Sequence, residues 1–193
     1  MAMYGILPKE GAEGRYFALK FALWAGMVSI SMMFGAFTSA YLVRKPAGNW
    51  YEFKLPTAFL FSTIVLLISS VCLEWAYRSF KNGNEKPYKA GIFLSLVTGV
   101  IFIALQVLGW KSMFAQGIAI NLNVSGSFLY VISGFHALHV LGGIAALLVS
   151  SLFAFSMPFL NSARRILRLD LVRQYWHFVD VLWIYLMLFL ILQ

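Results

Sequence analysis

The chain has 193 residues, of which 61% are hydrophobic and only 11% are charged, and its formal net charge is +8. Because soluble domains contain about 25% charged residues, this composition excludes an ordinary water-soluble globule and favours a protein of the lipid bilayer. The single cysteine excludes an internal disulfide and a CxxC zinc or redox motif.

Five apolar runs are each long enough to cross the hydrocarbon core, which takes about 20 residues in a helix. We expect helices because the runs are too long for the strands of a β-barrel and do not alternate in polarity. The connections are short, so we predict an all-α bundle of five transmembrane helices in a single domain, residues 1–193. The predicted spans are residues 16–43, 56–80, 90–113, 126–155 and 171–192.

The basic residues are divided unequally between the two sides of this bundle. Five spans place the N-terminus, the second connection and the fourth connection together, and this side carries most of the 15 Lys and Arg residues. The positive-inside rule therefore predicts a cytoplasmic N-terminus and an outside C-terminus. Since the charge follows topology, we expect no nucleic-acid partner. The residues on this side are Lys9, Arg15, Lys20, Arg78, Lys81, Lys86, Lys89, Arg164, Arg165, Arg168 and Arg173.

The second predicted span ends in CLEWAYRSFK, which places Glu74 and Arg78 four residues apart. This order favours an ion pair along one helix face. Glu74 lies deeper in the membrane than Arg78, so it pairs either with Arg78 or with a basic group of the fifth span.

The fourth predicted span contains GFHALHVLGG, with His136 and His139 on nearly one face. Gly142 and Ala146 form a small-xxx-small pair, which is typical of a close approach by another helix. We interpret the histidines as hydrogen-bonding to neighbouring helices. Metal or haem ligation is the alternative, and His139 with His177 would be the axial pair. The chain has only three histidines, so we predict no metal, cofactor or catalytic residue within it.

The fifth predicted span, QYWHFVDVLWIYLMLFLILQ, carries His177 and Asp180 inside an apolar run. Asp170 lies two turns before His177, so the three side chains share one stripe. Ionisable groups at membrane depth are costly and mark function or helix packing. We favour interhelical hydrogen bonds, and a proton path is the alternative.

The connection before the fifth span is rich in arginine and adjoins the predicted cytoplasmic surface. Such clusters attract anionic lipid headgroups. We therefore predict lipid binding by four residues, Arg164, Arg165, Arg168 and Arg173.

Two of these motifs resemble those of a known family. GFHALHVLGG, an arginine-rich loop and YWHFVDVLWIYL, in this order, resemble subunit III of the haem–copper oxidases, the cytochrome c and quinol oxidase family. Weaker likenesses lie in MMFGAFTSAYL, SSVCLEWAYRSFKNGNEK and IALQVLGW, so the resemblance extends from about Ala22 to Leu192. Asp170 matches a carboxylate that precedes the second motif in relatives. Ser29 stands where many relatives have a membrane-embedded glutamate, so that glutamate's role does not carry over.

The resemblance implies a function without a local active site. Five helices resemble the shorter bacterial form of this subunit, in the cytoplasmic membrane. Such a subunit holds no haem or copper and packs directly against subunit I, which houses the haems and one copper centre, in a complex with subunit II and other respiratory subunits. It supports proton uptake and protects the enzyme that reduces oxygen and pumps protons, and it carries bound phospholipid. The electron donor is decided by the partner subunits.

Three other functions compete with this one. A related accessory protein of nitric oxide reductase would carry similar motifs. A small transporter would need a substrate path through this bundle alone. A b-type cytochrome would use His139 and His177 as haem ligands.

Overall fold

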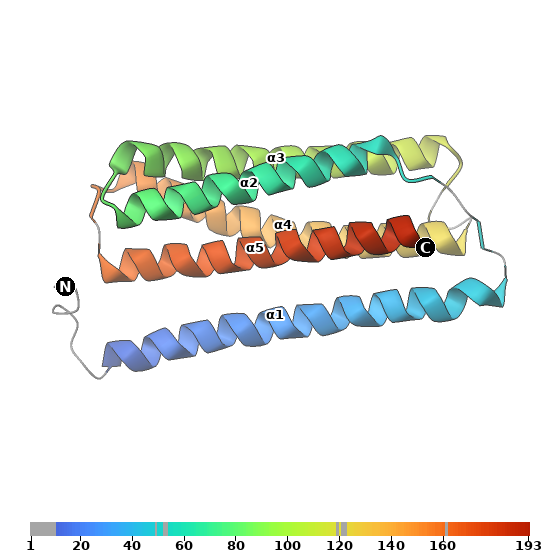
Figure 1. The fold of residues 1–193 in the computed structure, drawn as a ribbon, viewed down its shortest axis with the longest axis horizontal. Coiled ribbons are helices and arrows are strands. Elements are labelled where there is room, and N and C mark those ends of the chain that lie inside the picture. Colours follow the sequence, from blue (N-terminus) through green and yellow to red (C-terminus); the bar gives the residue numbers. More distant parts are fainter. Residues whose placement is uncertain (1–10, 49, 52–53, 119, 121–122, 161) are drawn as a thin grey trace.

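Long apolar runs separated by short polar turns form α-helices in the computed structural model of the chain (Figure 1). The structure describes residues 11–48, 50–51, 54–118, 120, 123–160 and 162–193. Within these residues it contains helices and no β-strand. The elements are α1 (Gly11–Arg44), the 3-10 turn η1 (Lys45–Ala47), α2 (Thr57–Lys81), α3 (Glu85–Ala115), α4 (Val124–Ser156) and α5 (Ala163–Leu192).

Each of the five α-helices is long and apolar enough to cross a membrane. The shortest, α2, has 25 residues. At 1.5 Å per residue it rises about 38 Å, which exceeds the roughly 30 Å of the hydrocarbon core. The prediction of an all-α, multi-pass membrane protein with five spans is therefore confirmed.

Four helices begin before their predicted spans, and α5, α3 and α1 differ most, with α1 starting at Gly11 instead of residue 16. The helix α5 starts at Ala163 instead of residue 171, and α3 starts at Glu85 instead of residue 90. The predicted spans were limited to apolar residues, but a helix can continue beyond them, because Arg and Leu are good helix formers whether or not they lie in lipid. Pro87 is tolerated in the first turn of α3, where backbone N–H groups have no helical partner. The non-helical connection between α4 and α5 is therefore shorter than the distance between the two predicted spans, and its arginines lie on α5.

The N-terminus of α1, the α2–α3 turn and the α4–α5 connection meet at one end of the bundle (Figure 1). The α2–α3 turn is tight because Gly83 adopts a positive φ of 77°. This end gathers most of the basic residues counted above, although Lys9 lies outside the described residues. The orientation of this end toward the cytoplasm remains a prediction.

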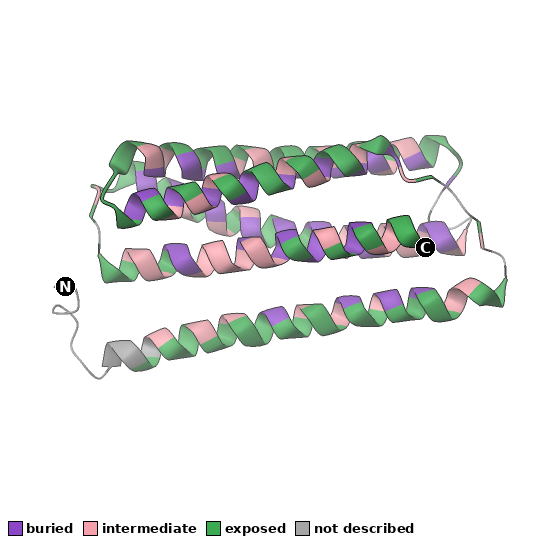
Figure 2. Cartoon of the chain, in the orientation of Figure 1, coloured by how far each residue is buried: buried purple, intermediate pink, exposed green. Residues whose placement is uncertain are grey.

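The helices α2 to α5 form the body of the bundle, and α1 packs along its side against α5 and α4. Figure 2 shows buried residues on the facing sides of α2 to α5, whereas α1 is exposed over most of its surface. Large side chains fill the core, and polar side chains also cross it. The Ser69 hydroxyl donates to the Ser95 carbonyl at 2.8 Å, and Trp183 Nε1 donates to Thr63 Oγ1 at 2.9 Å. Such bonds hold helices together in lipid, where burial of apolar surface contributes little.

Candidate functional site: a polar cluster between three helices

Arg173 of α5 lies at the centre of an ion-pair cluster near the basic end of the bundle. One guanidinium nitrogen donates to Glu74 Oε2 of α2 at 2.9 Å, and the other donates to Asp170 Oδ1 at 2.8 Å. The guanidinium also lies 4.3 Å from the centre of the Tyr77 ring. Arg78 Nε donates to Glu74 Oε1 at 2.8 Å. Both predicted partners of Glu74 are therefore confirmed, since it pairs with Arg78 and with a basic group of α5.

The first helix joins this cluster through Asp170 and Gln174, one turn apart on α5. Lys20 Nζ lies 3.7 Å from Asp170 Oδ2. Trp24 Nε1 donates to Gln174 Oε1 at 3.2 Å, and the Gln174 amide donates to Asp170 Oδ2 at 2.7 Å. The cluster thus connects α1, α2 and α5 through side chains that helical spacing places on one face of each helix.

The WHFVD segment continues the cluster toward the middle of the membrane. His177 Nδ1 lies 3.2 Å from Ser70 Oγ, and His177 Nε2 lies 3.6 Å from Glu74 Oε2, so the ring contacts α2 at two points. The buried Asp180 carboxyl also lies near Ser70, and its Oδ1 has no protein partner among the described residues. The His–Asp stripe of α5 therefore faces α2 and serves as an interhelical contact.

Replacing His177 by alanine is expected to lower the free energy of unfolding by about 1 kcal/mol, because two polar contacts to α2 are lost. The measurement is denaturation of the detergent-solubilised protein, with Tyr185→Phe as a comparison that removes one hydrogen bond from the same helix to α1 instead of to α2. Equal stability of His177→Ala and the unchanged protein would contradict a role for this ring in holding α2 and α5.

The two histidines of α4 lie away from this cluster. His136 is fully buried, with its ring stacked on Trp183 at 4.8 Å between centroids and with edge contacts to Phe34 and Phe102. Neither of its nitrogens has a hydrogen-bond partner, so the prediction that it bonds to a neighbouring helix is wrong. His139 Nδ1 pairs at 2.7 Å with the Phe135 carbonyl of its own helix. His136 therefore packs as an aromatic side chain.

The predicted close approach at Gly142 and Ala146 is also wrong, by one residue. A Cβ on Gly142 would meet only the Tyr175 hydroxyl, at 3.7 Å, whereas a Cβ on Gly143 would lie 2.8 Å from two ring atoms of Trp176. On the other side, a Cβ on Gly99 of α3 would lie 2.8 Å from Trp176 Cη2. Two glycines from two helices thus form a slot for the fully buried Trp176 ring.

The possible ligands of a metal or haem occupy different surroundings. His139 lies beside Phe34 and its own helix carbonyl, while His177 lies beside Ser70 and Glu74. Within the described ranges, no three His, Cys, Asp or Glu side chains gather in a group that could hold a metal ion.

The four arginines proposed for lipid binding differ in their surroundings. Arg165 donates to the Pro158 carbonyl at 2.6 Å, and the Arg168 guanidinium lies 5.9 Å from the Phe153 ring centre. Arg173 is held by two carboxylates, as described above. Arg164 is exposed on the first turn of α5. Arg168 is also exposed, so Arg164 and Arg168 are the two of these arginines whose side chains reach the surface most.

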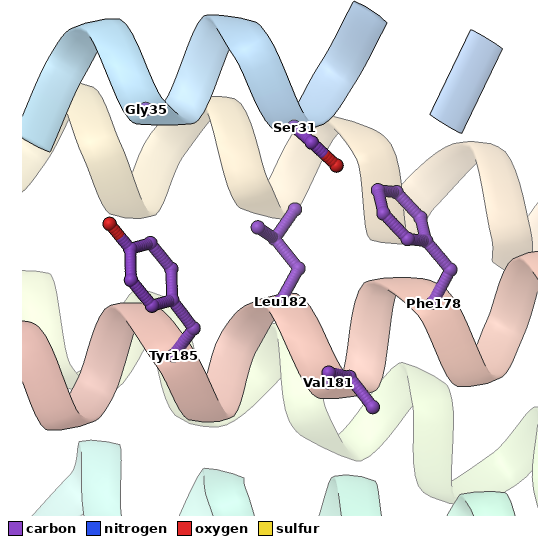
Figure 3. Close-up of a pocket in the computed structure, with 6 residues that line it drawn as sticks. All are labelled: Ser31, Gly35, Phe178, Val181, Leu182 and Tyr185. Carbon is purple, nitrogen blue, oxygen red and sulfur yellow. The ribbon is translucent and has the colours of Figure 1, made fainter. Parts of the chain in front are cut away.

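A cleft of about 310 Å³ lies between α1 and α5, midway along both helices. Figure 3 shows Phe178, Leu182 and Tyr185 of α5 pointing toward α1, which contributes Ser31 and Gly35. Beyond the cleft, the Thr38 and Tyr185 hydroxyls form a hydrogen bond of 3.0 Å.

Sequence reasoning did not find Lys20, Trp24, Gln174 or Ser70 as members of the cluster. Lys20, Trp24 and Ser70 contact residues that are 107 to 150 positions away in the chain, so no local spacing reveals them. Gln174 is four residues after Asp170, a helical spacing that could have indicated their hydrogen bond. One signal was available for Lys20, because a basic side chain inside an apolar helix needs a counter-charge or a route to water.

Comparison with known proteins gives one consistent result. The family model described as cytochrome c oxidase subunit III matches residues 17–192. The curated protein "Cytochrome c oxidase subunit 3" of Equus caballus is 36% identical over 127 residues, which cover 66% of this chain and 47% of that protein. The proteins of the same name from Equus asinus and Madoqua guentheri are 36% and 34% identical over the same shares. The chain thus spans about half the length of the curated relatives that it matches.

Proposed function

The chain belongs to the cytochrome c oxidase subunit III family, and from this premise we propose that it is a non-catalytic core subunit of a haem–copper terminal oxidase. In this proposal it packs against subunit I, supports proton uptake and protects the enzyme that reduces oxygen and pumps protons. The partner subunits hold the haems and copper, and this chain binds phospholipid. The membrane is the bacterial cytoplasmic membrane, with the N-terminus inside.

One observation carries the proposal: the polar side chains of the two diagnostic motifs are engaged in helix–helix contacts. His177 contacts α2, Asp170 contacts α1 through Lys20, and His136 is enclosed by aromatic rings. An assembly subunit requires such contacts because it contributes a fixed surface instead of a reacting group. The basic, partly exposed end of the bundle is also where proton uptake from the cytoplasm would begin.

We expect the chain to purify with subunits I and II, and a membrane preparation without it to retain the haem spectrum of the oxidase. Oxygen consumption should begin near its normal rate and then decline faster over successive turnovers. The measurement is oxygen uptake against time in both preparations, with haem absorption recorded in parallel.

Three results would contradict the proposal. A Soret band from the isolated chain would make it a cytochrome. Purification with a complex that reduces nitric oxide instead of oxygen would assign it to the reductase branch. Solute flux into liposomes containing only this chain would make it a transporter.

A further inference from the structure

The two halves of α1 are attached to the bundle in different ways. In the half that follows the cleft, Phe34, Thr38 and Tyr41 are buried. The Tyr41 ring lies 5.7 Å from the Phe128 ring of α4 and 5.2 Å from the Phe189 ring of α5, between centroids. This C-terminal half of α1 (residues 34–44) is therefore anchored by close aromatic packing.

The N-terminal half of α1 (residues 16–30) has little such packing. Met27 is its one buried residue among those described, and Phe17 and Phe21 are 71% and 77% exposed. Among the described residues, the polar contacts between this half and the rest of the bundle run to one place on α5, through Lys20 and Trp24. In a bilayer, lipid chains replace apolar helix contacts at little cost, so these polar contacts decide where this half lies.

The four residues Lys20, Trp24, Asp170 and Gln174 form a latch that can separate at low cost. If Lys20 leaves, Asp170 keeps its bonds to Arg173 at 2.8 Å and to Gln174 at 2.7 Å. No buried carboxylate is left without a partner, which would otherwise oppose separation. Lys20 already has 31% of its side chain exposed, so its ammonium group needs little movement to reach the headgroup layer.

The cleft lies between the latch and the anchored C-terminal half of α1. Gly35, which lines the cleft, is the second residue of that half. A Cβ on Gly35 would meet nothing within 4 Å, so the two helices are not in close contact there. The space gives the N-terminal half of α1 room to change its angle to α5 without a steric clash.

We infer that α1 is a hinged strap: its C-terminal half stays anchored while its N-terminal half moves between a latched position on α5 and a released one. Release widens the cleft toward the bilayer and closure narrows it, so the latch sets access to the cleft. This device goes beyond the proposed function and does not depend on which complex contains the chain.

The test measures distances between spin labels on α1 and α5, using the full-length chain in lipid nanodiscs. Cys72 is replaced by alanine so that introduced cysteines are the only ones in the chain. The inner pair is Phe17→Cys with Arg168→Cys, and the outer pair is Val43→Cys with Leu188→Cys. All four positions are exposed. Double electron–electron resonance then gives the distance distribution of each pair.

Removing the latch with Lys20→Met and Trp24→Phe should broaden the inner-pair distribution and move it to longer distances. The arm from Phe34 to residue 17 is about 25 Å, so a tilt of about 10° moves the label by about 4 Å. The outer pair should not change, which also shows that the variant is folded. Lys20→Arg, which keeps the charge, should retain the original inner-pair distance.

The matched control is Thr38→Val, which removes one hydrogen bond between the same two helices at the anchored end. It should leave both distances unchanged. An unchanged inner pair in the latch variant would overturn the inference. A shift of both pairs together would also overturn it, because α1 would then move as a rigid rod.

Discussion

Replacing Gly143 by alanine is expected to lower the free energy of unfolding by about 1–3 kcal/mol, the usual cost of forcing extra volume into a close-packed core. The added Cβ would lie 2.8 Å from Trp176 Cε3 and Cζ3, far inside normal contact distance. The ring cannot retreat, because it also packs against Gly99, where an added Cβ would likewise lie 2.8 Å from the ring. The measurement is denaturant titration of the purified protein in mixed micelles.

The neighbouring Gly142→Ala provides a matched control. It makes the same chemical change one residue earlier in the same helix, but its Cβ meets only the Tyr175 hydroxyl at 3.7 Å. We expect it to be neutral or slightly stabilising, because alanine is the better helix former. Trp176→Ala should cost about 3–5 kcal/mol by leaving a cavity. If Gly142→Ala and Gly143→Ala were equally harmful, the slot would not be the cause.

Replacing Arg173 by methionine is expected to cost about 2–3 kcal/mol, somewhat below the 3–5 kcal/mol for breaking a fully buried ion pair. The change leaves Glu74 and Asp170 without the cation that joins them. The cost is reduced because about a quarter of the Arg173 side chain reaches the surface, with an exposed fraction of 26%. The expected result is lower thermal stability and weaker attachment of α2 to α5.

Arg78→Met tests whether the loss of stability depends on how far the arginine is buried. Arg78 binds the same carboxylate at 2.8 Å, but its side chain is 73% exposed. An exposed pair of this kind contributes about 0.5 kcal/mol. Adding Glu74→Gln and Asp170→Asn to Arg173→Met should restore part of the stability, because the two carboxylates that lost this cation are then neutral. Arg78 and Lys20, which also pair with them, have side chains that are 73% and 31% exposed, so their charges can reach water or headgroups. A failure of these changes to restore any stability would indicate that the arginine acts through packing alone.

The number of helices and the family could be predicted from the sequence because both depend on local signals. Apolar runs of 20 or more residues and the two histidine motifs are visible without knowing any contact. The start of α5 could not be predicted in the same way. Its first turns contain arginines that leave the hydrocarbon, and hydropathy marks the edge of the lipid instead of the end of the helix.

Residues that meet across the bundle were only partly predictable. Glu74 was expected to pair either with Arg78 or with a basic group of the fifth span, and it contacts both Arg78 and Arg173. The slot for Trp176 was missed by one residue. One residue is a rotation of 100° around a helix, and α4 has small residues on several faces, so the pattern did not distinguish Gly142 from Gly143. The contact with the Trp176 ring of α5, which only the structure shows, identifies Gly143 as the glycine at the close approach.

The packing of α1 against α5 has a consequence for biosynthesis. The helix α1 leaves the ribosome before α5, on which its polar partners lie, and Trp24 and Gln174 are 150 residues apart. A single apolar helix is stable in lipid because its backbone hydrogen bonds are made internally. We therefore expect α1 to span the membrane as a separate helix during synthesis, with Lys20 at the headgroups. Its contacts with α5 form once Asp170 has left the ribosome. The docking of α1 on α5 therefore follows the synthesis of α5.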